Sequence, residues 1–222
     1  MSHAQRYDKQ LAMIRHYQLY PNLLPWVGDA FEGSPRILIL GESHYLDAAS
    51  TYHHQADKWY AGVDLRLVTD RGHMNTRGII RSGLASRWKE KSKLIYRNIE
   101  AGLQDAQIEV PVGESPFQRI AYMNYFQRPA QLSGQSIVVT AMDKRHSAAV
   151  FNSVLEVLRP EVVVFCSGLA WRAARQEGVL TSPANAEIRF GSTPHPSTSW
   201  WHRAMRKYGG RSGKELFIQM LK

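Results

Sequence analysis

The segment SAAVFNSVLEVLRPEVVVFCSGLAWRAARQ, residues 147–176, decides the expected fold of the chain. Apolar residues at helical spacing predict a helix over residues 147–158, which Arg159-Pro160 ends. The continuous apolar run at 161–166 is typical of a strand that is buried on both faces, and a second predicted helix, 169–176, follows it at once. This order of helix, strand and helix predicts an α/β sandwich with a parallel sheet.

Three other segments extend the predicted sheet. Residues 36–41 (RILILG) form a short apolar run closed by a glycine, residues 119–124 (RIAYMN) end in a polar residue, and residues 186–190 (AEIRF) supply a fourth strand. Residues 137–140 (IVVT) are compatible with a further short strand. We therefore expect a three-layer α/β/α sandwich with a mainly parallel central sheet of about four strands.

The rest of the chain is expected to belong to the same single domain, 1–222, because no internal repeat or Pro/Ser-rich linker divides it. Residues 1–35 are expected to hold an amphipathic helix, 10–20, and then a loop, 25–35, rich in Pro and Gly. Residues 46–116 are expected to form a helical insertion, with helices near 79–87 and 93–104, over the sheet edge that carries a site. A helix over 213–221 closes the chain.

Composition narrows the classes of function. A chain of 222 residues with 44% hydrophobic and 21% charged residues is suited to one globular core, not to a disordered protein. A net charge of +9 favours polyanions such as nucleic acid as partners. Cys166 is the single cysteine, which excludes an internal disulfide framework and any four-cysteine zinc or iron–sulfur site. With a polar N-terminus and no long apolar run, we expect a cytoplasmic protein without membrane association, and nothing indicates an obligate protein partner.

Polar residues follow each predicted strand, and in open α/β sheets ligands bind outside the carboxyl ends of the strands. Gly41-Glu42-Ser43-His44-Tyr45 follows the first strand, Asn124 ends the second, Ser167 follows the third, and residues 193–197 (TPHPS) follow the fourth. The sequence therefore predicts that these side chains meet in one pocket at this edge of the sheet.

These motifs, in this order, resemble those of the uracil-DNA glycosylase superfamily, and of its divergent bacterial members in particular. The resemblance rests on a strand ending in Gly-x-x-x-Tyr, a later strand ending in Asn, a Val-Val-Val-Phe-x-x-Gly strand and a late His-Pro-Ser loop, over roughly residues 36–201. It implies a uracil-DNA glycosylase-like fold and a DNA-repair enzyme that flips a damaged base, uracil first, and hydrolyses its N-glycosidic bond. No cofactor or metal is implied.

The resemblance also implies roles for single residues. Gly41 to Tyr45 would form the wall beneath the flipped base, with Tyr45 packed against it, and Asn124 would read the hydrogen-bonding edge of the base. His195 would stabilise negative charge on the departing base. In active family members the third residue of the first motif is an aspartate or asparagine that positions water; here it is Ser43, and the adjacent Glu42 is the alternative carboxylate. The expected DNA contacts are Ser197, the wedge residues Trp200 and Trp201, and the basic residues Arg203, Arg206 and Lys207.

Basic residues are concentrated in two stretches, which supports a phosphate-binding rim. Residues 71–97 hold eight Lys or Arg and one acidic residue, Glu90. Residues 188–214 hold six Lys or Arg and no acidic residue, and they include the His-Pro-Ser loop. Ordinary solvated helix faces are the alternative explanation of such stretches.

Structural explanations also exist for the candidate residues. Gly41 can serve a tight turn, His44 can cap a helix or turn, and Asn124 can satisfy loop backbone groups. The two tryptophans could be core residues, but their basic surroundings favour exposure. The His53-His54 pair with Asp57 fits no common metal-ligand spacing, Cys166 is expected to be buried and inert, and no dinucleotide or Walker motif occurs. Two other functions stay open: a non-catalytic nucleic-acid-binding or damage-sensing protein of the same fold, and a hydrolase or binder of a small nucleotide-like molecule.

Overall fold

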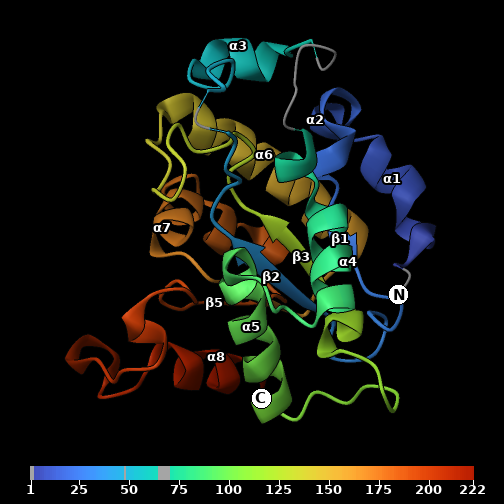
Figure 1. The fold of residues 1–222 in the computed structure, drawn as a ribbon, viewed down its shortest axis with the longest axis vertical. Coiled ribbons are helices and arrows are strands. Elements are labelled where there is room, and N and C mark those ends of the chain that lie inside the picture. The colour runs from blue at the N-terminus through green and yellow to red at the C-terminus, as the bar shows by residue number, and fades with distance from the viewer. Residues whose placement is uncertain (1–2, 48, 65–70) are drawn as a thin grey trace.

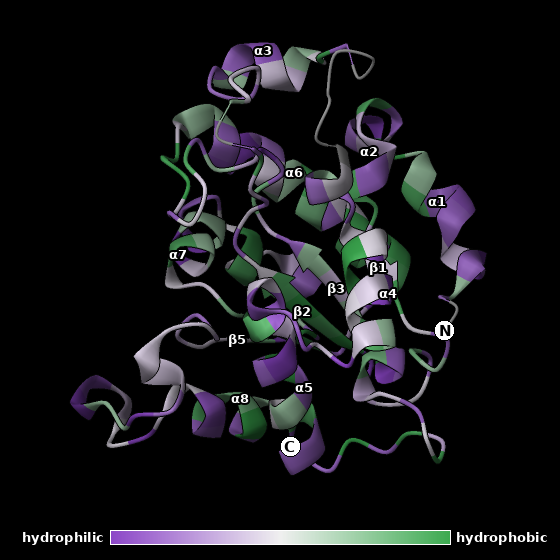
Figure 2. Cartoon of the chain, in the orientation of Figure 1, coloured by the Kyte–Doolittle hydropathy of each residue, from purple (hydrophilic) through white to green (hydrophobic). Residues whose placement is uncertain are grey.

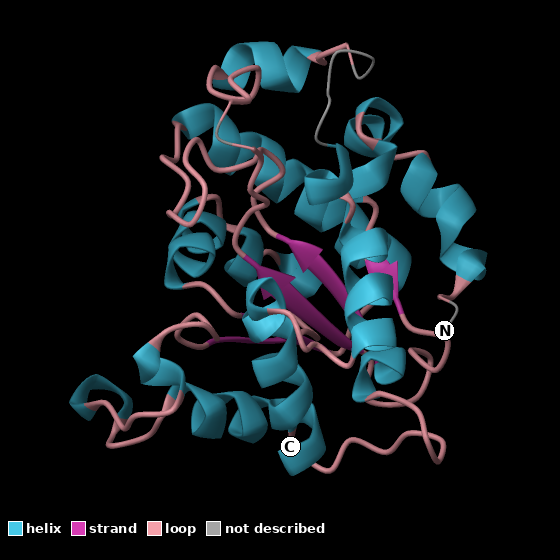
Figure 3. Cartoon of the chain, viewed as in Figure 1, coloured by secondary structure: helices cyan, strands magenta, loops and turns pink. Residues whose placement is uncertain are grey.

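A computed structural model describes residues 3–47, 49–64 and 71–222 of the chain, and the structural statements below concern these residues. They form a mixed α/β fold around a mostly parallel sheet of five strands, which lies at the centre of Figures 1 and 3. The strands are β1 (Trp26–Val27), β2 (Ile37–Gly41), β3 (Ile120–Asn124), β4 (Val162–Phe165) and β5 (Arg189–Ser192). Their spatial order is β1-β3-β2-β4-β5, and only β1 runs antiparallel to its neighbour.

The helices follow the same numbering along the chain. The α-helices are α1 (Asp8–Ala12), α2 (Arg15–Leu19), α3 (Ala56–Ala61), α4 (Thr76–Ser86), α5 (Leu94–Asp105), α6 (Ala141–Leu158), α7 (Gly168–Gln176) and α8 (Gly213–Leu221). The 3₁₀ helices are η1 (Gln5–Tyr7), η2 (Pro21–Leu23), η4 (Arg71–Met74), η5 (Lys91–Lys93), η6 (Pro116–Arg119), η7 (Val179–Thr181), η8 (Pro183–Asn185), η9 (Ser199–Trp201) and η10 (Arg206–Tyr208).

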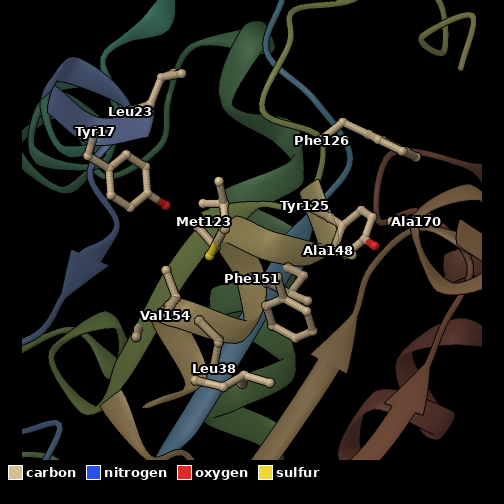
Figure 4. Close-up of a cluster of buried hydrophobic side chains, with 14 of the residues drawn as sticks. Tyr17, Leu23, Leu38, Met123, Tyr125, Phe126, Ala148, Phe151, Val154 and Ala170 are labelled. Carbon is tan, nitrogen blue, oxygen red and sulfur yellow. The ribbon is translucent and has the colours of Figure 1, made fainter. Parts of the chain in front are cut away.

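Helices cover both faces of the sheet, because successive side chains of a strand point to opposite faces. In β2, Leu38 and Leu40 belong to a core that includes residues of α2, α6 and α7, while Ile37 and Ile39 belong to a second core with α4, α5 and α8. Figure 4 shows the first core, where Leu38 and Met123 of the sheet face Phe151 and Val154 of α6. Figure 2 shows β2 as a hydrophobic strand at the centre, surrounded by helices that contain both hydrophilic and hydrophobic residues. This doubly covered arrangement confirms the α/β class that the apolar strands predict.

Several predicted boundaries differ from the structure. The predicted helix 10–20 is two short helices, α1 and α2, because Ile14 is extended between them and so lets both Leu11 and Tyr17 reach the core. The predicted loop 25–35 contains β1, so the sheet has five strands instead of about four. A two-residue strand is too short to leave a periodic pattern in the sequence.

Two predictions near the sheet edges are wrong in detail. Residues 137–140 form no strand; Thr140 instead caps α6 through a reciprocal capping box with Asp143, so that the helix begins at Ala141 and not at residue 147. The fourth predicted strand, 186–190, is shifted: β5 begins at Arg189 and continues to Ser192, because a turn at 186–187 follows η8 before the chain becomes extended.

The predicted N-terminal segment and helical insertion each extend beyond the described part of the chain. Residues 1–2 of the former, and residues 48 and 65–70 of the latter, lie outside the described residues. Within the described part, α4 and α5 correspond to the two predicted helices of the insertion and cover one face of the sheet (Figure 1). No helix among the described residues is long and apolar enough to cross a membrane.

One buried ion pair joins three separate parts of the fold. Arg128, just beyond β3, and Asp143 of α6 are both fully buried, and the guanidinium donates to both carboxylate oxygens, Nε to Oδ1 at 2.8 Å and Nη2 to Oδ2 at 2.6 Å. Arg128 also donates to the backbone carbonyl of His53 at 2.9 Å, and Asp143 accepts from the Tyr60 hydroxyl at 3.0 Å. Hydrogen bonds from Arg128 hold the pKa of Asp143 below its usual range although burial opposes this shift.

We predict that Arg128→Ala lowers the free energy of unfolding by about 3–5 kcal/mol, because it leaves Asp143 as a buried carboxylate without its ionic partner. Chemical denaturation followed by circular dichroism measures this change. The control is Lys214→Ala, which removes the partly exposed ion pair with Asp105 and is expected to cost about 1 kcal/mol or less. Equal stability of the two variants would contradict the claim that the Arg128–Asp143 ion pair stabilises the fold more than the Lys214–Asp105 pair.

Candidate functional site

A cavity of ≈ 620 Å³ lies at the carboxyl ends of β2, β3 and β5. This volume is within the ~300–1,000 Å³ typical of small-molecule sites. Its lining includes five of the residues that the sequence singled out: Glu42, Ser43, Tyr45, Asn124 and His195. The structure therefore brings together side chains that are up to 153 positions apart in the chain, from Glu42 to His195.

Gly41 does not line the cavity but lets its neighbours approach the end of β2. A Cβ atom at this position would lie 2.2 Å from Asn124 Oδ1 and 2.2 Å from the Tyr122 hydroxyl. Backbone pairing continues beyond the strands, because the carbonyls of Gly41, Glu42 and His44 accept from the backbone N–H groups of Tyr125, Phe126 and Ala130 at 3.0, 2.9 and 2.9 Å. The segment that carries Glu42, Ser43 and Tyr45 is thus held by the loop that follows β3.

The Glu42 carboxylate is held from the neighbouring strand. Ser167, just beyond β4, donates its hydroxyl to Glu42 Oε2 at 2.6 Å, a charge-assisted hydrogen bond. The charge of Glu42 acts on two other cavity residues, since it raises the pKa of Tyr45, in addition to the larger effect of burial there, and opposes the lowering of the His195 pKa. The carboxylate is therefore electrostatically coupled to both candidate partners.

His195 is fixed in a rigid loop after β5. Its Nδ1 atom lies 2.8 Å from the Ser197 hydroxyl and accepts from the Ser197 backbone N–H at 3.3 Å. Because Nδ1 is an acceptor, the proton of the neutral ring is assigned to Nε2. Burial lowers the pKa of His195, so a neutral imidazole with an Nε2–H donor is the expected form near pH 7. Asn98 of α5 stabilises this loop by donating to the Pro196 carbonyl at 2.7 Å.

Asn124 is nearly buried, at 7% exposure, where β3 meets the cavity. Its Oδ1 accepts from the Tyr122 hydroxyl at 3.2 Å, and its backbone carbonyl accepts from Gln127 Nε2 at 2.8 Å. The Tyr122 hydroxyl thus orients the side-chain amide, which is the group that could read a planar polar edge.

His44 contacts the first residue of α4, although it also lines the cavity. Its Nε2 atom lies 3.1 Å from Thr76 Oγ1, and burial lowers the pKa of His44 to about 4. The residue thus helps to dock α4 over the cavity as a neutral imidazole.

α4, α5 and the residues next to them form a helical wall of the cavity. The sequence analysis did not name the residues of this wall, which include Asn75, Ser82, Lys93, Ile95 and Tyr96. The sequence predicted a helical insertion over this sheet edge but not which of its residues face the cavity, because that depends on how α4 and α5 dock.

The candidate DNA-contacting residues lie beyond the cavity on the segment after His195. Trp200 is 48% exposed, and Arg203, Arg206 and Lys207 are exposed, as is Ser197. The expectation of an exposed Trp201 is wrong: its side chain is fully buried and packs against Phe217 of α8, with ring centroids 5.4 Å apart. The 3₁₀ turn of η9 sends the two adjacent indoles in different directions.

Two alternative chemistries find no support among the described residues. His53 and His54 place their Nε2 atoms 2.9 and 3.1 Å from the backbone carbonyls of Ala130 and Gln131, and no group of three His, Cys, Asp or Glu side chains in the described chain could hold a metal ion. Cys166 is buried, and burial raises the pKa of its thiol to about 12, so that it is not a nucleophile.

Comparison with known proteins gives no further constraint: no protein-family model and no curated protein sequence matches the chain. The chemical interpretation of the cavity therefore depends on its own residues.

We predict that His44 makes the fold sensitive to acid. The pKa of His44 is about 4 in the folded chain and 6.5 in its ordinary state, so the unfolded state binds more protons between these values. The contribution of the neutral His44 to the free energy of unfolding is fully present above pH 6.5 and is lost as the pH falls to about 4. This loss amounts to about 3 kcal/mol. Denaturation of His44→Gln at several pH values should show a weaker loss of stability across this window.

The control variant is His202→Gln, because His202 is an exposed residue outside the cavity. It should keep the pH dependence of the unmodified protein. Identical pH dependence in His44→Gln would contradict the assignment of a buried neutral imidazole.

Proposed function

We propose that the protein is a DNA glycosylase-like enzyme of the uracil-DNA glycosylase type, which flips a damaged base, uracil first, into the cavity and hydrolyses its N-glycosidic bond. One observation carries the proposal: Glu42, Tyr45, Asn124 and His195 line a single cavity at the carboxyl edge of a parallel sheet. The resemblance assigns a role to each of them. Glu42 is the alternative carboxylate and Tyr45 packs against the base. Asn124 reads the edge of the base, and His195 stabilises the negative charge on the departing base.

The chemistry of the bond explains why these groups suit it. When the N-glycosidic bond breaks, its electron pair leaves with the base as an anion and the sugar acquires oxocarbenium character. The Nε2–H of His195 can donate a hydrogen bond to the oxygen of the departing base, which stabilises the developing charge. The Asn124 amide can hydrogen-bond to the base edge, and the Tyr45 ring can pack on its face.

Water completes the reaction through the carboxylate. The water oxygen forms a bond to the sugar carbon, and Glu42 accepts the proton that the water loses. Ser43 takes the position of the acid of active family members and is a residue of the cavity lining, but its hydroxyl oxygen is buried without a hydrogen-bond partner among the described residues. A buried hydroxyl offers no surface to a water in the cavity, so that Glu42 is the residue that supplies what the aspartate supplies in the family.

The exposed segment that follows the His195 loop supports a polyanionic substrate. The exposed residues Trp200, Arg203, Arg206 and Lys207 follow the His195 loop directly in the chain. Lysine and arginine at such a surface bind phosphates, and an exposed indole can stack on a base or enter the duplex. Trp200 alone can serve as the apolar wedge, since Trp201 belongs to the core.

We predict that His195→Ala lowers the rate of uracil excision by about 10²–10³-fold, because it removes the donor to the departing base. The measurement is strand cleavage at alkali-labile abasic sites in single- and double-stranded oligonucleotides that contain uracil. His54→Ala is the control, as His54 lies outside the cavity. Excision that is unchanged in His195→Ala would refute the assignment.

If the unmodified protein excises no base, the result would favour one of the two alternative functions. Retained DNA binding would then favour the damage-sensing alternative, for which the Ser43 substitution is the supporting observation. Binding of a free nucleotide without dependence on DNA length would favour the small-molecule alternative.

We predict that the double variant Arg206→Ala/Lys207→Ala weakens DNA binding and flattens its salt dependence. Each lost phosphate contact should reduce the slope of log affinity against log salt concentration by about 0.9 on duplex DNA. Fluorescence anisotropy with labelled DNA at several salt concentrations measures both quantities. Lys9→Ala is the control, because Lys9 is also exposed but lies on α1, away from this segment (Figure 1). Equal slopes for all three proteins would exclude the segment as a phosphate-binding surface.

A further inference from the structure

Ser167 makes a contact that the roles discussed so far leave unexplained. It is 1% exposed and is the N-cap residue of α7, where its Oγ accepts from the Ala170 backbone N–H at 3.2 Å. An N-cap needs only this acceptor function. The same oxygen, however, donates to Glu42 Oε2 at 2.6 Å, which joins the start of α7 to the segment after β2.

The N-cap restricts the direction of the hydroxyl proton. A serine hydroxyl has one proton, and its oxygen accepts from Ala170 at the N-cap. The proton is thereby directed to Glu42, and the hydroxyl cannot turn away without losing one of the two bonds. Ser167 is itself held rigidly, since the adjacent Cys166 backbone N–H donates to the Leu40 carbonyl at 2.7 Å.

This contact also determines which oxygen of Glu42 is available. Ser167 occupies one of the two acceptor sites of Oε2, which favours Oε1 as the oxygen that takes a proton. Glu42 lines the cavity, and its charge acts on His195. The Ser167 contact therefore affects both groups that the proposed hydrolysis needs, the carboxylate that accepts a proton and the imidazole that stabilises the departing base.

We infer that Ser167 is a positioning residue that holds the Glu42 carboxylate beside His195, so that Glu42, and not Ser43, is the group that takes the proton from the attacking water. The inference rests on the proposed function for the hydrolytic step. The contact between Ser167 and Glu42, and its effect on His195, can be tested without any activity.

The test is an NMR titration of the His195 ring in the unmodified protein, four single variants and one double variant. Glu42→Gln should lower the His195 pKa, because it removes the negative charge that raises it. Ser167→Ala should shift the His195 pKa in the same direction, because the released carboxylate no longer stays beside the ring. Ser167→Thr, which keeps both the cap and the hydroxyl, should restore the original value.

Ser212→Ala is the matched control for the loss of an N-cap. Ser212 caps α8 through the Glu215 backbone N–H at 3.2 Å and lies outside the cavity lining, so this variant should leave the His195 titration unchanged. When Glu42 is already replaced by Gln, Ser167→Ala should cause no further change in the His195 pKa. A His195 pKa that is unchanged by Ser167→Ala or by Glu42→Gln would overturn the inference, as would an equal shift in Ser212→Ala.

Excision kinetics form the second arm. Ser167→Ala should lower kcat by roughly 10-fold with little change in KM, since it disturbs the hydrolytic group and not base binding. Ser212→Ala should retain kcat, and a retained kcat in Ser167→Ala would overturn the hydrolytic role. An inactive unmodified protein would count against the proposed function alone, because the His195 titration would still decide whether Ser167 positions Glu42.

Discussion

The buried ion pair between Arg128 and Asp143 is the contact on which the geometry of the site depends. Arg128 belongs to the loop after β3 and also holds the His53 carbonyl, while Asp143 belongs to the first turn of α6 and also holds the Tyr60 hydroxyl. Two desolvated charges persist in a protein interior only when their hydrogen-bonding capacity is satisfied, and here backbone and side-chain groups from three segments satisfy it. The pair therefore fixes the loop that in turn pairs with the backbone after β2, where the candidate catalytic residues lie.

The site combines this rigid support with opposed electrostatic effects. Burial lowers the pKa of His195, which keeps a neutral donor in the cavity, and Glu42 limits the shift without forming an ion pair with the ring. The Ser167 hydroxyl holds Glu42 from the N-cap of α7, and Asn98 of α5 holds the His195 loop. Glu42 and the His195 loop are thus each positioned by an element other than their own, so this part of the cavity is assembled by packing of the sheet and its helices.

The fold was predictable where a sequence pattern corresponds to burial. The apolar runs of β2, β3 and β4 predicted strands within one or two residues, because strands covered on both faces contain hardly any polar residues. β1 was not predictable, since two residues form a strand only by pairing with β3. Residues 137–140 have β-forming side chains, yet the capping box of Thr140 and Asp143 begins a helix there. β1 thus depends on a tertiary contact, whereas at Thr140 one local signal, the capping box, outweighs another, the β propensity of the preceding residues.

The sequence by itself determined the α/β class, the parallel strands and the residues that follow them, because buried strands and their polar ends leave a local pattern. That pattern predicted that the residues after β2, Asn124 and the His195 loop meet at one edge of the sheet, and it left open whether the Glu42 side chain reaches the pocket. Only the tertiary structure decided that Ser167 holds Glu42, that His44 docks α4, and that Trp201 is buried while Trp200 is exposed. The physical reason is that a side chain's direction and partner depend on how the elements pack, and packing joins residues far apart in the chain.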